Sequence, residues 1–411
     1  MSAERRNDEL QETIAPVSAE PDAGDVRMSG TVELTSLPAV SRSGNQVTLT
    51  SRNEIRYRNE SVLGRGGMGE VQLANDQDIG RRVAVKRLLN QKNPQSVARF
   101  IDEVRTVGKL EHPNIVPIHD VGVDADGCLF FVMKYVDGET LASIIGRLRE
   151  GDVAYHKRYR FEARLDLFSG LMRALQYAHE QGMLHRDVKP ENIMVGHFGE
   201  VMLTDWGIAR HVNYNEGSSS DDAKSAGEMP RASGQTMDGS IIGTIGYMSP
   251  EQASGRSEEI DERSDLYAAF VVLYELLSTR SFVQRGDSLM KAITDAKKRQ
   301  VPQFLDPNYD SRYQPAVPAE LRHFLRRGLQ PLKADRFQNA NDVLRDLERI
   351  RSGEPPIQCA GTLIKVANAR LERLVDRHPL LAISLYATTA CVFLIGIVTT
   401  CMVIVARWSP T

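Results

Sequence analysis

Eight consecutive residues, 185–192, constrain this chain more than any other stretch of it. They read His-Arg-Asp-Val-Lys-Pro-Glu-Asn and place a carboxylate, an ammonium and a carboxamide close together. Asp187 can accept a proton from an attacking hydroxyl, Lys189 can neutralise charge on a moving phosphoryl group, and Asn192 can offer an oxygen to a metal ion. A polar loop that caps a helix would explain one or two of these residues but not the set. The run therefore predicts phosphoryl-transfer chemistry.

A glycine-rich run at 64–71 precedes this loop and reads Gly-Arg-Gly-Gly-Met-Gly-Glu-Val. Glycines let backbone N–H groups approach phosphates closely, but alone such a cluster is equally typical of a flexible hairpin. Val62 and Val71 alternate with polar residues, as in a strand–turn–strand, and no helix signal follows. This pattern argues against the strand–turn–helix of a dinucleotide-binding motif.

A short strand and an amphipathic segment follow the glycines. In the run 83–86, Ala84 and Lys86 share one strand face, so the lysine either faces a ligand or lies on an exposed edge strand. The amphipathic segment that runs to Leu110 carries two candidate carboxylates, Asp102 and Glu103. Taken alone, either one could be an ordinary solvated helix carboxylate.

These motifs, with Asp-Trp-Gly at 205–207 and the run 243–251, resemble the eukaryotic-like serine/threonine protein kinase family in its bacterial form. The resemblance covers roughly residues 57–350. It implies an α+β fold of two lobes, an antiparallel sheet with one helix followed by a mainly helical lobe, in a catalytic domain at 56–350. Lys189, two residues beyond Asp187, matches the serine/threonine form of the catalytic loop.

The resemblance assigns roles to single residues, with ATP and Mg²⁺ as cofactors and protein Ser/Thr hydroxyls as acceptors. Asp187 is the implied base, and Lys189 and Lys86 neutralise phosphate charge. The register of the motif favours Glu103 as the partner that orients Lys86. Asn192 and Asp205 are the implied metal ligands. The implied ATP-binding residues are Leu63, Gly64, Gly66, Gly69, Val71, Ala84, Lys86, Lys134 and Val136.

Three supporting contacts are also implied by the resemblance. Glu251 is expected to pair with Arg336, and Asp265 to anchor the backbone of the catalytic loop. The hydroxyl of Thr244 is expected near the catalytic loop, where it would shape the substrate pocket. Glu139 is a further expected contact, to the ribose of ATP.

The sequence departs from the family at three places: Lys134 stands for the usual Glu, Trp206 for Phe, and Ser249 for Ala. These departures are the support for an alternative function, a pseudokinase scaffold that transfers little phosphate. All the chemically essential side chains are present, so the sequence favours the active enzyme. A kinase acting on small molecules fits poorly with the intact substrate-pocket motifs.

The segment between the metal-binding run and residue 251 suggests regulation by phosphorylation. Residues 213–240 are rich in Ser, Gly and Asp, which is typical of a disordered loop. We expect autophosphorylation within Ser233, Thr236 and Ser240, and Thr236 is favoured because its phosphate could reach the region of Arg186.

Composition excludes some classes of protein. The net charge is −3, so general nucleic-acid binding is not expected. Four cysteines, two of them in an apolar run, give no disulfide framework and suit a reducing cytoplasm. A basic segment at 146–164 is either a docking patch for an acidic partner or a solvated loop.

The two ends differ in character. Residues 1–55 are polar, read as a disordered arm and contain no signal peptide. The stretch 380–406 contains 27 residues and no formal charge, and a membrane-spanning helix needs roughly 20. A buried core helix is the alternative. The sequence thus predicts a single-pass transmembrane helix that anchors the protein in the cell membrane and contacts the lipid bilayer.

Charges beside this apolar stretch predict its orientation. One basic residue, Arg407, follows the apolar stretch. Four basic residues precede it: Lys365, Arg370, Arg373 and Arg377. Basic residues favour the cytoplasmic side, so the kinase domain is expected in the cytoplasm and 407–411 as a short tail outside. The connector 351–379 is either an amphipathic helix lying on anionic lipid or a plain linker. The anchor could also support a homodimer.

Overall fold

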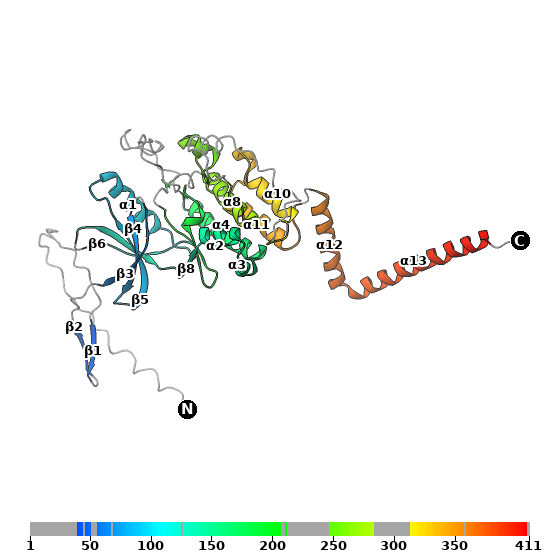
Figure 1. Cartoon of the computed structure of the whole chain (residues 1–411), viewed down its shortest axis with the longest axis horizontal. Helices are drawn as coiled ribbons and strands as arrows, with labels where there is room; N and C mark the ends of the chain where they lie inside the picture. Colours follow the sequence, from blue (N-terminus) through cyan, green and yellow to red (C-terminus); the bar gives the residue numbers. More distant parts are fainter. Residues whose placement is uncertain are drawn as a thin grey trace, which may run out of the picture. The chain divides into compact units, whose positions relative to one another are not determined.

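The structure is a computed structural model of the chain, and it describes residues 39–43, 46–50, 56–66, 69–124, 126–206, 210–211, 246–282, 313–356 and 359–408. The chain divides into two units, Met1–Arg56 and Tyr57–Thr411. Within the second unit, Figure 1 shows a group of strands with helix α1 and a larger group of helices that includes α4, α8 and α11.

Five antiparallel strands form the sheet of the first group, the N-lobe, in the order β3-β4-β5-β7-β6. Their bounds are β3 (Tyr57–Arg65), β4 (Gly69–Asp76), β5 (Arg81–Leu88), β6 (Ile118–Val123) and β7 (Leu129–Lys134). Successive side chains alternate between the two faces of the sheet. One face carries an apolar core: Ala74, Val83, Val85, Phe130 and Val132. The alternation therefore sends Ala84 and Lys86 to the other face.

Helix α1 (Pro94–Val107) packs against this sheet. The side chain of Asn93 caps it by accepting a hydrogen bond from a backbone N–H of the first turn, and proline suits that turn because it needs no N–H partner. Phe100, Glu103 and Val107 are its buried residues. Their spacing of three and four places them on one helix face, so the helix carries the Glu103 carboxylate toward the sheet.

Helices make up most of the second group, the C-lobe. They are α2 (Leu141–Glu150), α3 (Val153–Arg158), α4 (Phe161–Glu180), α7 (Pro250–Ala253), α8 (Glu262–Ser278), α10 (Ala319–Gly328) and α11 (Ala340–Arg351). Helix α8 is its centre, because every residue from Ser264 to Ser278 is buried. Burying one large apolar side chain of this kind contributes about 1.5–3 kcal/mol, so α8 is the main apolar support of the lobe.

Short strands frame the catalytic loop. Strand β9 (Met183–Leu184) precedes the loop and pairs with β12 (Arg210–His211), and β10 (Ile193–Gly196) follows it, between β8 (Gly138–Thr140) and β11 (Val201–Leu203). Single 3-10 turns lie at η1 (Pro190–Asn192), η2 (Ser257–Glu259) and η3 (Lys333–Asp335). The predicted bilobal fold, an antiparallel sheet plus a helical lobe, is confirmed.

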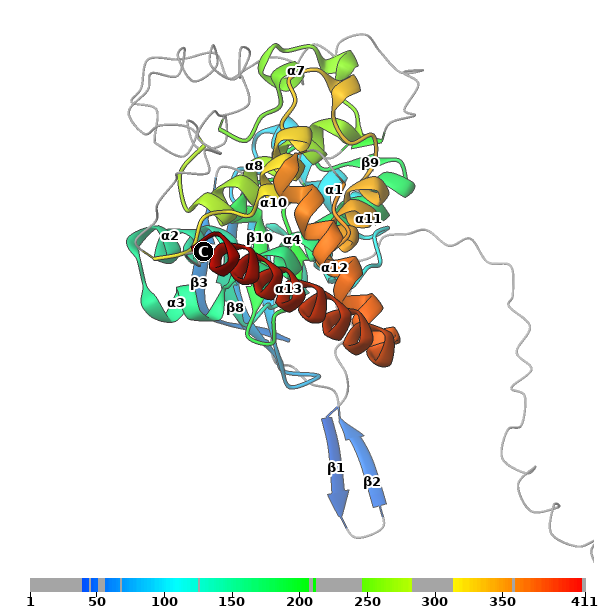
Figure 2. The ribbon, with the colours of Figure 1, turned by 90° about the vertical axis from the view of Figure 1, so that its right-hand side faces the viewer.

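Two regions outside the lobes differ from the expectations. Strands β1 (Ala39–Ser43) and β2 (Gln46–Thr50) pair as an antiparallel hairpin, which the prediction of a disordered arm did not include. The connector contains helix α12 (Ala360–Arg377), so a plain linker is wrong for these residues. Figures 1 and 2 both show α12 beginning beside α10. Lys365 of α12 forms an ion pair of 2.7 Å with Glu320 of α10 there.

The last helix is α13 (Pro379–Trp408), which includes the predicted membrane span at 380–406 as one continuous helix. Among the helices in the described part of the chain, none is both long enough and apolar enough to cross a bilayer. The structure therefore does not support the transmembrane helix expected from the sequence.

Candidate active site

The catalytic loop holds Asp187 in a defined orientation. One carboxylate oxygen, Oδ2, accepts hydrogen bonds from Lys189 Nζ at 2.8 Å and from Asn192 Nδ2 at 3.1 Å. The backbone N–H of Asp187 donates to His185 Nδ1 at 3.2 Å. None of the described residues donates a hydrogen bond to the second oxygen, Oδ1. This oxygen can therefore accept a proton from an incoming hydroxyl.

His185 is buried beneath the loop and supports it. Its Nδ1 accepts from Asp187, so its Nε2 carries the proton and donates to the carbonyl of Thr204 at 3.0 Å. The ring lies edge-on to Trp206, with ring centroids 4.6 Å apart. Trp206 is itself buried, so the indole fills the apolar slot expected for it and places the neighbouring Asp205 next to the loop.

Asp265, at the start of α8, anchors the loop as expected. Its two carboxylate oxygens accept from the backbone N–H groups of His185 at 2.8 Å and Arg186 at 2.7 Å. Arg186 has a φ of +65°, a left-handed conformation that costs a non-glycine residue about 1–2 kcal/mol. The Gln252 side chain also donates to the Arg186 carbonyl at 3.0 Å. These contacts stabilise a backbone turn that would otherwise relax.

Lys86 connects the two lobes through two ion pairs. Its ammonium lies 2.6 Å from Glu103 Oε1 and 2.7 Å from Asp205 Oδ1. Burial alone would lower the pKa of Lys86, but the carboxylates of Asp205 and Glu103 outweigh burial and hold this pKa above its usual value. Burial likewise raises the pKa of Asp205, and the Lys86 charge more than reverses this, so its pKa lies below the usual range. Lys86 and Asp205 are therefore charged at neutral pH, whereas burial raises the pKa of Glu103 above its usual value despite the Lys86 charge.

The residues expected to bind a metal ion have the right atoms available. Asn192 uses its Nδ2 to donate to Asp187, which leaves the amide oxygen for a cation. Asp205 is half exposed and keeps one oxygen beyond the Lys86 pair. The described residues contain no cluster of three or more His, Cys, Asp or Glu that could hold a metal. The pair of oxygen donors fits Mg²⁺, which binds through one or two protein oxygens plus phosphates and water.

Gly64 and Gly66, at the end of β3, have open space beside them. A Cβ atom added at Gly64 or Gly66 would meet no atom within 4 Å. Packing therefore does not require glycine at these two positions. Close approach of a phosphate to the backbone would require it, because a side chain would stand in the way. At Gly69 the constraint is internal, because a Cβ would lie 2.3 Å from the Arg87 carbonyl oxygen.

The strand register groups most of the other expected nucleotide contacts. Val71 lies opposite Lys86, and Ala84 lies opposite Met133. Leu63, on β3, is about half exposed. Because paired residues share a sheet face, Val71, Ala84 and Met133 lie on the face that carries Lys86.

The segment after β7 reaches the C-lobe. The backbone N–H of Lys134 donates to the Pro117 carbonyl at 3.1 Å, so only the carbonyl of Lys134 could bond a nucleotide. Val136 is buried. The backbone groups that remain as candidates for binding adenine are therefore the carbonyl of Lys134 and the N–H and carbonyl of Val136.

The expected pairing of Glu251 with Arg336 is confirmed. Two nitrogens of Arg336 donate to the two Glu251 oxygens at 2.8 and 2.9 Å, and both side chains are buried. Burial raises the pKa of Glu251, but the hydrogen bonds and charge of Arg336 outweigh burial, so the pKa lies below its usual value. Ser264 adds a third hydrogen bond at 2.6 Å.

The three expected phosphorylation sites and Thr244, the residue expected to shape the substrate pocket, belong to the activation segment. Ser233, Thr236, Ser240 and Thr244 all lie outside the described residues. After β12, the described part of the segment resumes at Gly246, and the Tyr247 hydroxyl donates to Glu275 Oε2 at 2.9 Å. Glu275 was not predicted from the sequence, because it lies within an apolar helix and has no motif around it.

Both interpretations of the basic segment 146–164 were wrong for its last residue, Arg164. Arg164 is buried and donates to the carbonyls of Tyr159 at 2.7 Å and Leu276 at 2.8 Å. Burial lowers the pKa of Arg164 to about 10. Arg149 lies 3.7 Å from the Glu275 carboxylate. These charges connect α2 and α4 to α8, and the buried Arg164 is not available to a partner.

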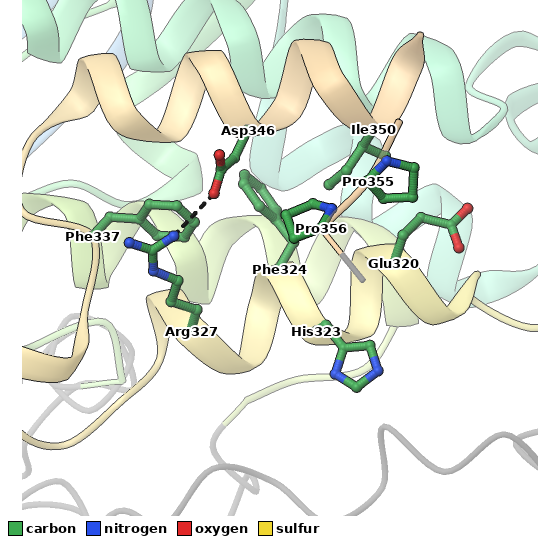
Figure 3. Close-up of a pocket in the computed structure, with 9 residues that line it drawn as sticks. All are labelled: Glu320, His323, Phe324, Arg327, Phe337, Asp346, Ile350, Pro355 and Pro356. Atoms are coloured by element: carbon green, nitrogen blue, oxygen red, sulfur yellow. Dashed lines mark hydrogen bonds and ion pairs between the residues drawn. The ribbon is translucent and has the colours of Figure 1, made fainter. Parts of the chain in front are cut away.

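A small pocket lies away from this site, between α10, α11 and the residues that follow α11. Figure 3 shows the side chains that line it and, at one side, the Arg327–Asp346 ion pair of 2.9 Å. Phe324, Ile350 and Pro356 are among the lining residues. None of the residues predicted for catalysis or ATP binding lines it.

Comparison with known proteins agrees with the geometry. The protein kinase domain family matches residues 57–346, which is most of the chain. The serine/threonine-protein kinase PknD of Protochlamydia amoebophila is 32% identical over 319 residues, covering 75% of this chain and 31% of that protein. A probable serine/threonine-protein kinase of Streptomyces coelicolor, SCO3848, is 37% identical over 308 residues, covering 73% of this chain and 40% of that protein.

Chlamydia trachomatis contains a third relative, also named serine/threonine-protein kinase PknD, which is 30% identical over 318 residues. The match covers 75% of this chain and 33% of that protein. The chain thus spans about a third of the length of these curated relatives. The predicted family, with its serine/threonine kinase domain, is confirmed by these comparisons.

Proposed function

This chain belongs to the protein kinase family, and we propose that it transfers the γ-phosphoryl group of ATP to serine and threonine hydroxyls of proteins. The observation that carries this proposal is the geometry around Lys86, which joins Glu103 of the N-lobe to Asp205 of the C-lobe. A phosphate bound at this ammonium would lie beside the carboxylate that is expected to ligate Mg²⁺.

The catalytic loop supplies the remaining steps. Asp187 Oδ1 accepts the proton of the acceptor hydroxyl, while its Oδ2 stays fixed by Lys189 and Asn192. Lys189 also places a positive charge next to the attacking oxygen. Bound Mg²⁺ would neutralise phosphate charge from its place at Asn192 and Asp205. Catalysis would therefore depend mainly on positioning and on electrostatic stabilisation.

Two of the three departures that support the pseudokinase scaffold, Ser249 and Trp206, have structural roles. Ser249 caps helix α7, and it forms a reciprocal capping box with Gln252. Trp206 is fully packed beside His185. Since these two departures from the family have structural roles, neither indicates a loss of catalysis, and active phosphoryl transfer is the better supported function.

The choice of acceptor can be tested with peptide pools that contain serine, threonine or tyrosine as the single hydroxyl residue. We expect phosphate from Mg²⁺-ATP on the serine and threonine pools and none on the tyrosine pool. Transfer to the tyrosine pool alone would overturn the serine/threonine assignment without overturning the kinase.

Autophosphorylation of the activation segment is part of the proposal. Its candidates are Ser233, Thr236 and Ser240, of which Thr236 is favoured. The support is chemical, since Arg186 places a positive charge beside the catalytic base and a phosphate could pair with it. Phosphopeptide mapping of fully active enzyme should find phosphate in 213–240, and its absence would contradict the idea.

We also propose that the kinase works in bacterial signalling at the cell membrane, held there by 380–406. The charge-free sequence supports this location, as do several strongly exposed apolar side chains on α13: Val392, Phe393, Leu394, Ile395 and Met402. Within the described residues, no helix is both long enough and apolar enough to cross a bilayer. Membrane fractionation of the chain with and without residues 380–411 decides the matter, because release from membranes only after truncation is expected.

A further inference from the structure

One side of helix α12 is packed against the C-lobe. Thr362 and Val366 are buried on this side. Ala369 lies against the turn after α11, because a Cβ atom added at Gly353 would be only 3.1 Å from the Ala369 Cβ. The three α12 residues are four and three positions apart, which places them on one side of a helix. This packed side therefore holds α12 on the domain, and the opposite side of the helix points away from it.

Two ion pairs reinforce the packed side. Lys365 lies 2.7 Å from Glu320 of α10. Arg373, four positions after Ala369, lies 2.5 Å from Glu354, which follows α11. Two of the positive charges of α12 are therefore neutralised by carboxylates of the kinase domain.

The outward side of α12 is apolar. Leu363, Ile364 and Leu371 are 51%, 60% and 49% exposed. Ile364, Ala367 and Leu371 are three and four positions apart, so their side chains follow one another along one side of the helix. Isolated exposed apolar side chains are ordinary, whereas a contiguous apolar strip indicates a surface that binds a partner. The three exposed residues with Ala367 form such a strip.

Two arginines border this apolar strip. Arg370 and Arg377 are exposed, and neither forms an ion pair with a residue that the structure describes. Arg370 comes three positions after Ala367 of the strip and four positions after Val366 of the packed side, so it stands between the two. Arg377 is seven positions further along, on the same border. The charges that the kinase domain does not neutralise therefore lie directly beside the exposed apolar residues.

An apolar strip with a basic border fits a lipid surface that has acidic headgroups. In an interfacial helix, apolar side chains enter the boundary between headgroups and acyl chains, and basic side chains beside them bind the headgroup phosphates. Glu372 and Asp376 are exposed on the other border, so the arginine border would turn toward the lipid. A second copy of the chain fits less well, because the strip ends within two heptads and coiled-coil pairing needs about three or four.

We propose that α12 binds an anionic lipid surface through Leu363, Ile364 and Leu371, with Arg370 and Arg377 on the headgroup phosphates. The packed side of the helix stays on the C-lobe, so this contact also orients the catalytic domain at the membrane. The inference rests on the proposed location at a membrane, but it needs no helix that crosses one.

The test uses the full-length chain with the substitution Ile364→Trp, which adds a fluorescent side chain to the apolar strip. Asp376→Trp is the matched control, because Asp376 is exposed on the other border. Each protein is mixed with vesicles of phosphatidylcholine, with or without phosphatidylglycerol, whose brominated acyl chains quench a tryptophan that enters the bilayer. The parent chain gives the signal of the two native tryptophans. We expect Ile364→Trp to be quenched at least about three-fold more when phosphatidylglycerol is present, and Asp376→Trp to be quenched little in either case.

The arginine border is tested in the Ile364→Trp protein. Arg370→Gln should raise the phosphatidylglycerol content that gives half-maximal quenching, because one basic residue near an anionic surface strengthens binding about five-fold. Arg373→Gln removes the same charge from the packed side and should shift this midpoint much less. Phosphate transfer to peptide without lipid should be unchanged in both variants, which shows that the kinase domain is intact.

Three results would overturn the inference. Equal quenching at positions 364 and 376 would show that α12 only follows α13 into the lipid. Quenching of Trp408 without quenching at position 364 would show that α12 stays off the surface. A dimer in sedimentation that is lost in Leu371→Ser, with no lipid-dependent quenching, would assign the strip to a second copy of the chain. Failure of the parent chain to bind vesicles at all is a different outcome, since it would also overturn the proposed membrane location.

Discussion

The Lys86 ammonium lies 2.6 Å from Glu103, and both side chains are almost entirely buried. Because Glu103 lies on α1 and Lys86 on β5, the position of the helix and the position of the lysine side chain depend on each other. Asp205 adds the second carboxylate at 2.7 Å. The ion pairs therefore connect the N-lobe to Asp205, the expected metal ligand of the C-lobe.

Replacing Glu103 with Gln should reduce kcat about 100-fold, because Lys86 would keep only Asp205 as a charged partner and shift from its place. The amide is isosteric, so circular dichroism should show an unchanged fold. Asp102→Asn is the matched control, since Asp102 is the exposed neighbour on the same helix. Equal losses in the two variants would contradict the assignment of Glu103.

Asp265→Asn should lower kcat by about 10²-fold or more and leave ATP affinity nearly unchanged. The amide keeps the shape but cannot accept hydrogen bonds at both positions that now bind the N–H groups of His185 and Arg186. The strained turn at Arg186 would then relax and move Asp187. A variant with normal kcat would show that the anchor is not needed for catalysis.

Arg336→Leu should destabilise the domain by about 3–5 kcal/mol, because it leaves the Glu251 carboxylate buried and unpaired. Urea denaturation of the variant gives this value. Arg345→Leu, which breaks the exposed pair with Asp342, should cost less than about 1 kcal/mol.

The same pair predicts a pH dependence of stability. The pKa of Glu251 is lowered in the folded state from an ordinary value of 4.5, because Arg336 outweighs the effect of burial. Its contribution to stability is therefore complete above about pH 4.5 and is lost as the pH falls through the folded-state pKa. The stability difference between the parent and Arg336→Leu should shrink in acid. A difference that stays constant from pH 7 to pH 3 would contradict this account.

Trp206→Phe should change stability by less than about 1.5 kcal/mol. The smaller ring leaves a cavity, but it also removes the indole N–H, which is buried and finds no hydrogen-bond partner among the described residues. We expect kcat within about three-fold of the parent, measured by steady-state kinetics. A large loss of activity would give the tryptophan a role beyond filling the slot.

The sequence predicted the residues expected to carry the chemistry better than the residues that hold the site in place. The loop 185–192 and the pairs of Lys86 with Glu103 and of Glu251 with Arg336 were expected, because short motifs carry their residues. Glu275 was missed, since tertiary packing alone brings it to its partner. Arg164 was misread as a surface charge, because nothing in a basic run shows that one guanidinium is buried.

The end of the chain was the least predictable part. A charge-free stretch resembles a membrane span, but hydropathy cannot show how a helix is placed. Within the described residues, no helix has the length and apolar character of a span, even though α13 is continuous over 30 residues. The connector formed helix α12 because Lys365 and the buried Val366 hold its first turns near α10.

The central claim is phosphoryl transfer by Asp187. The most direct measurement is phosphate incorporation from Mg²⁺-ATP by the full-length chain beside Asp187→Asn, with ATP binding measured on both proteins. The account predicts that both proteins bind ATP and that only the parent transfers phosphate, with a loss of at least about 100-fold in the variant. Equal transfer by both would contradict the role of Asp187, and ATP binding without transfer by either would contradict the proposed activity.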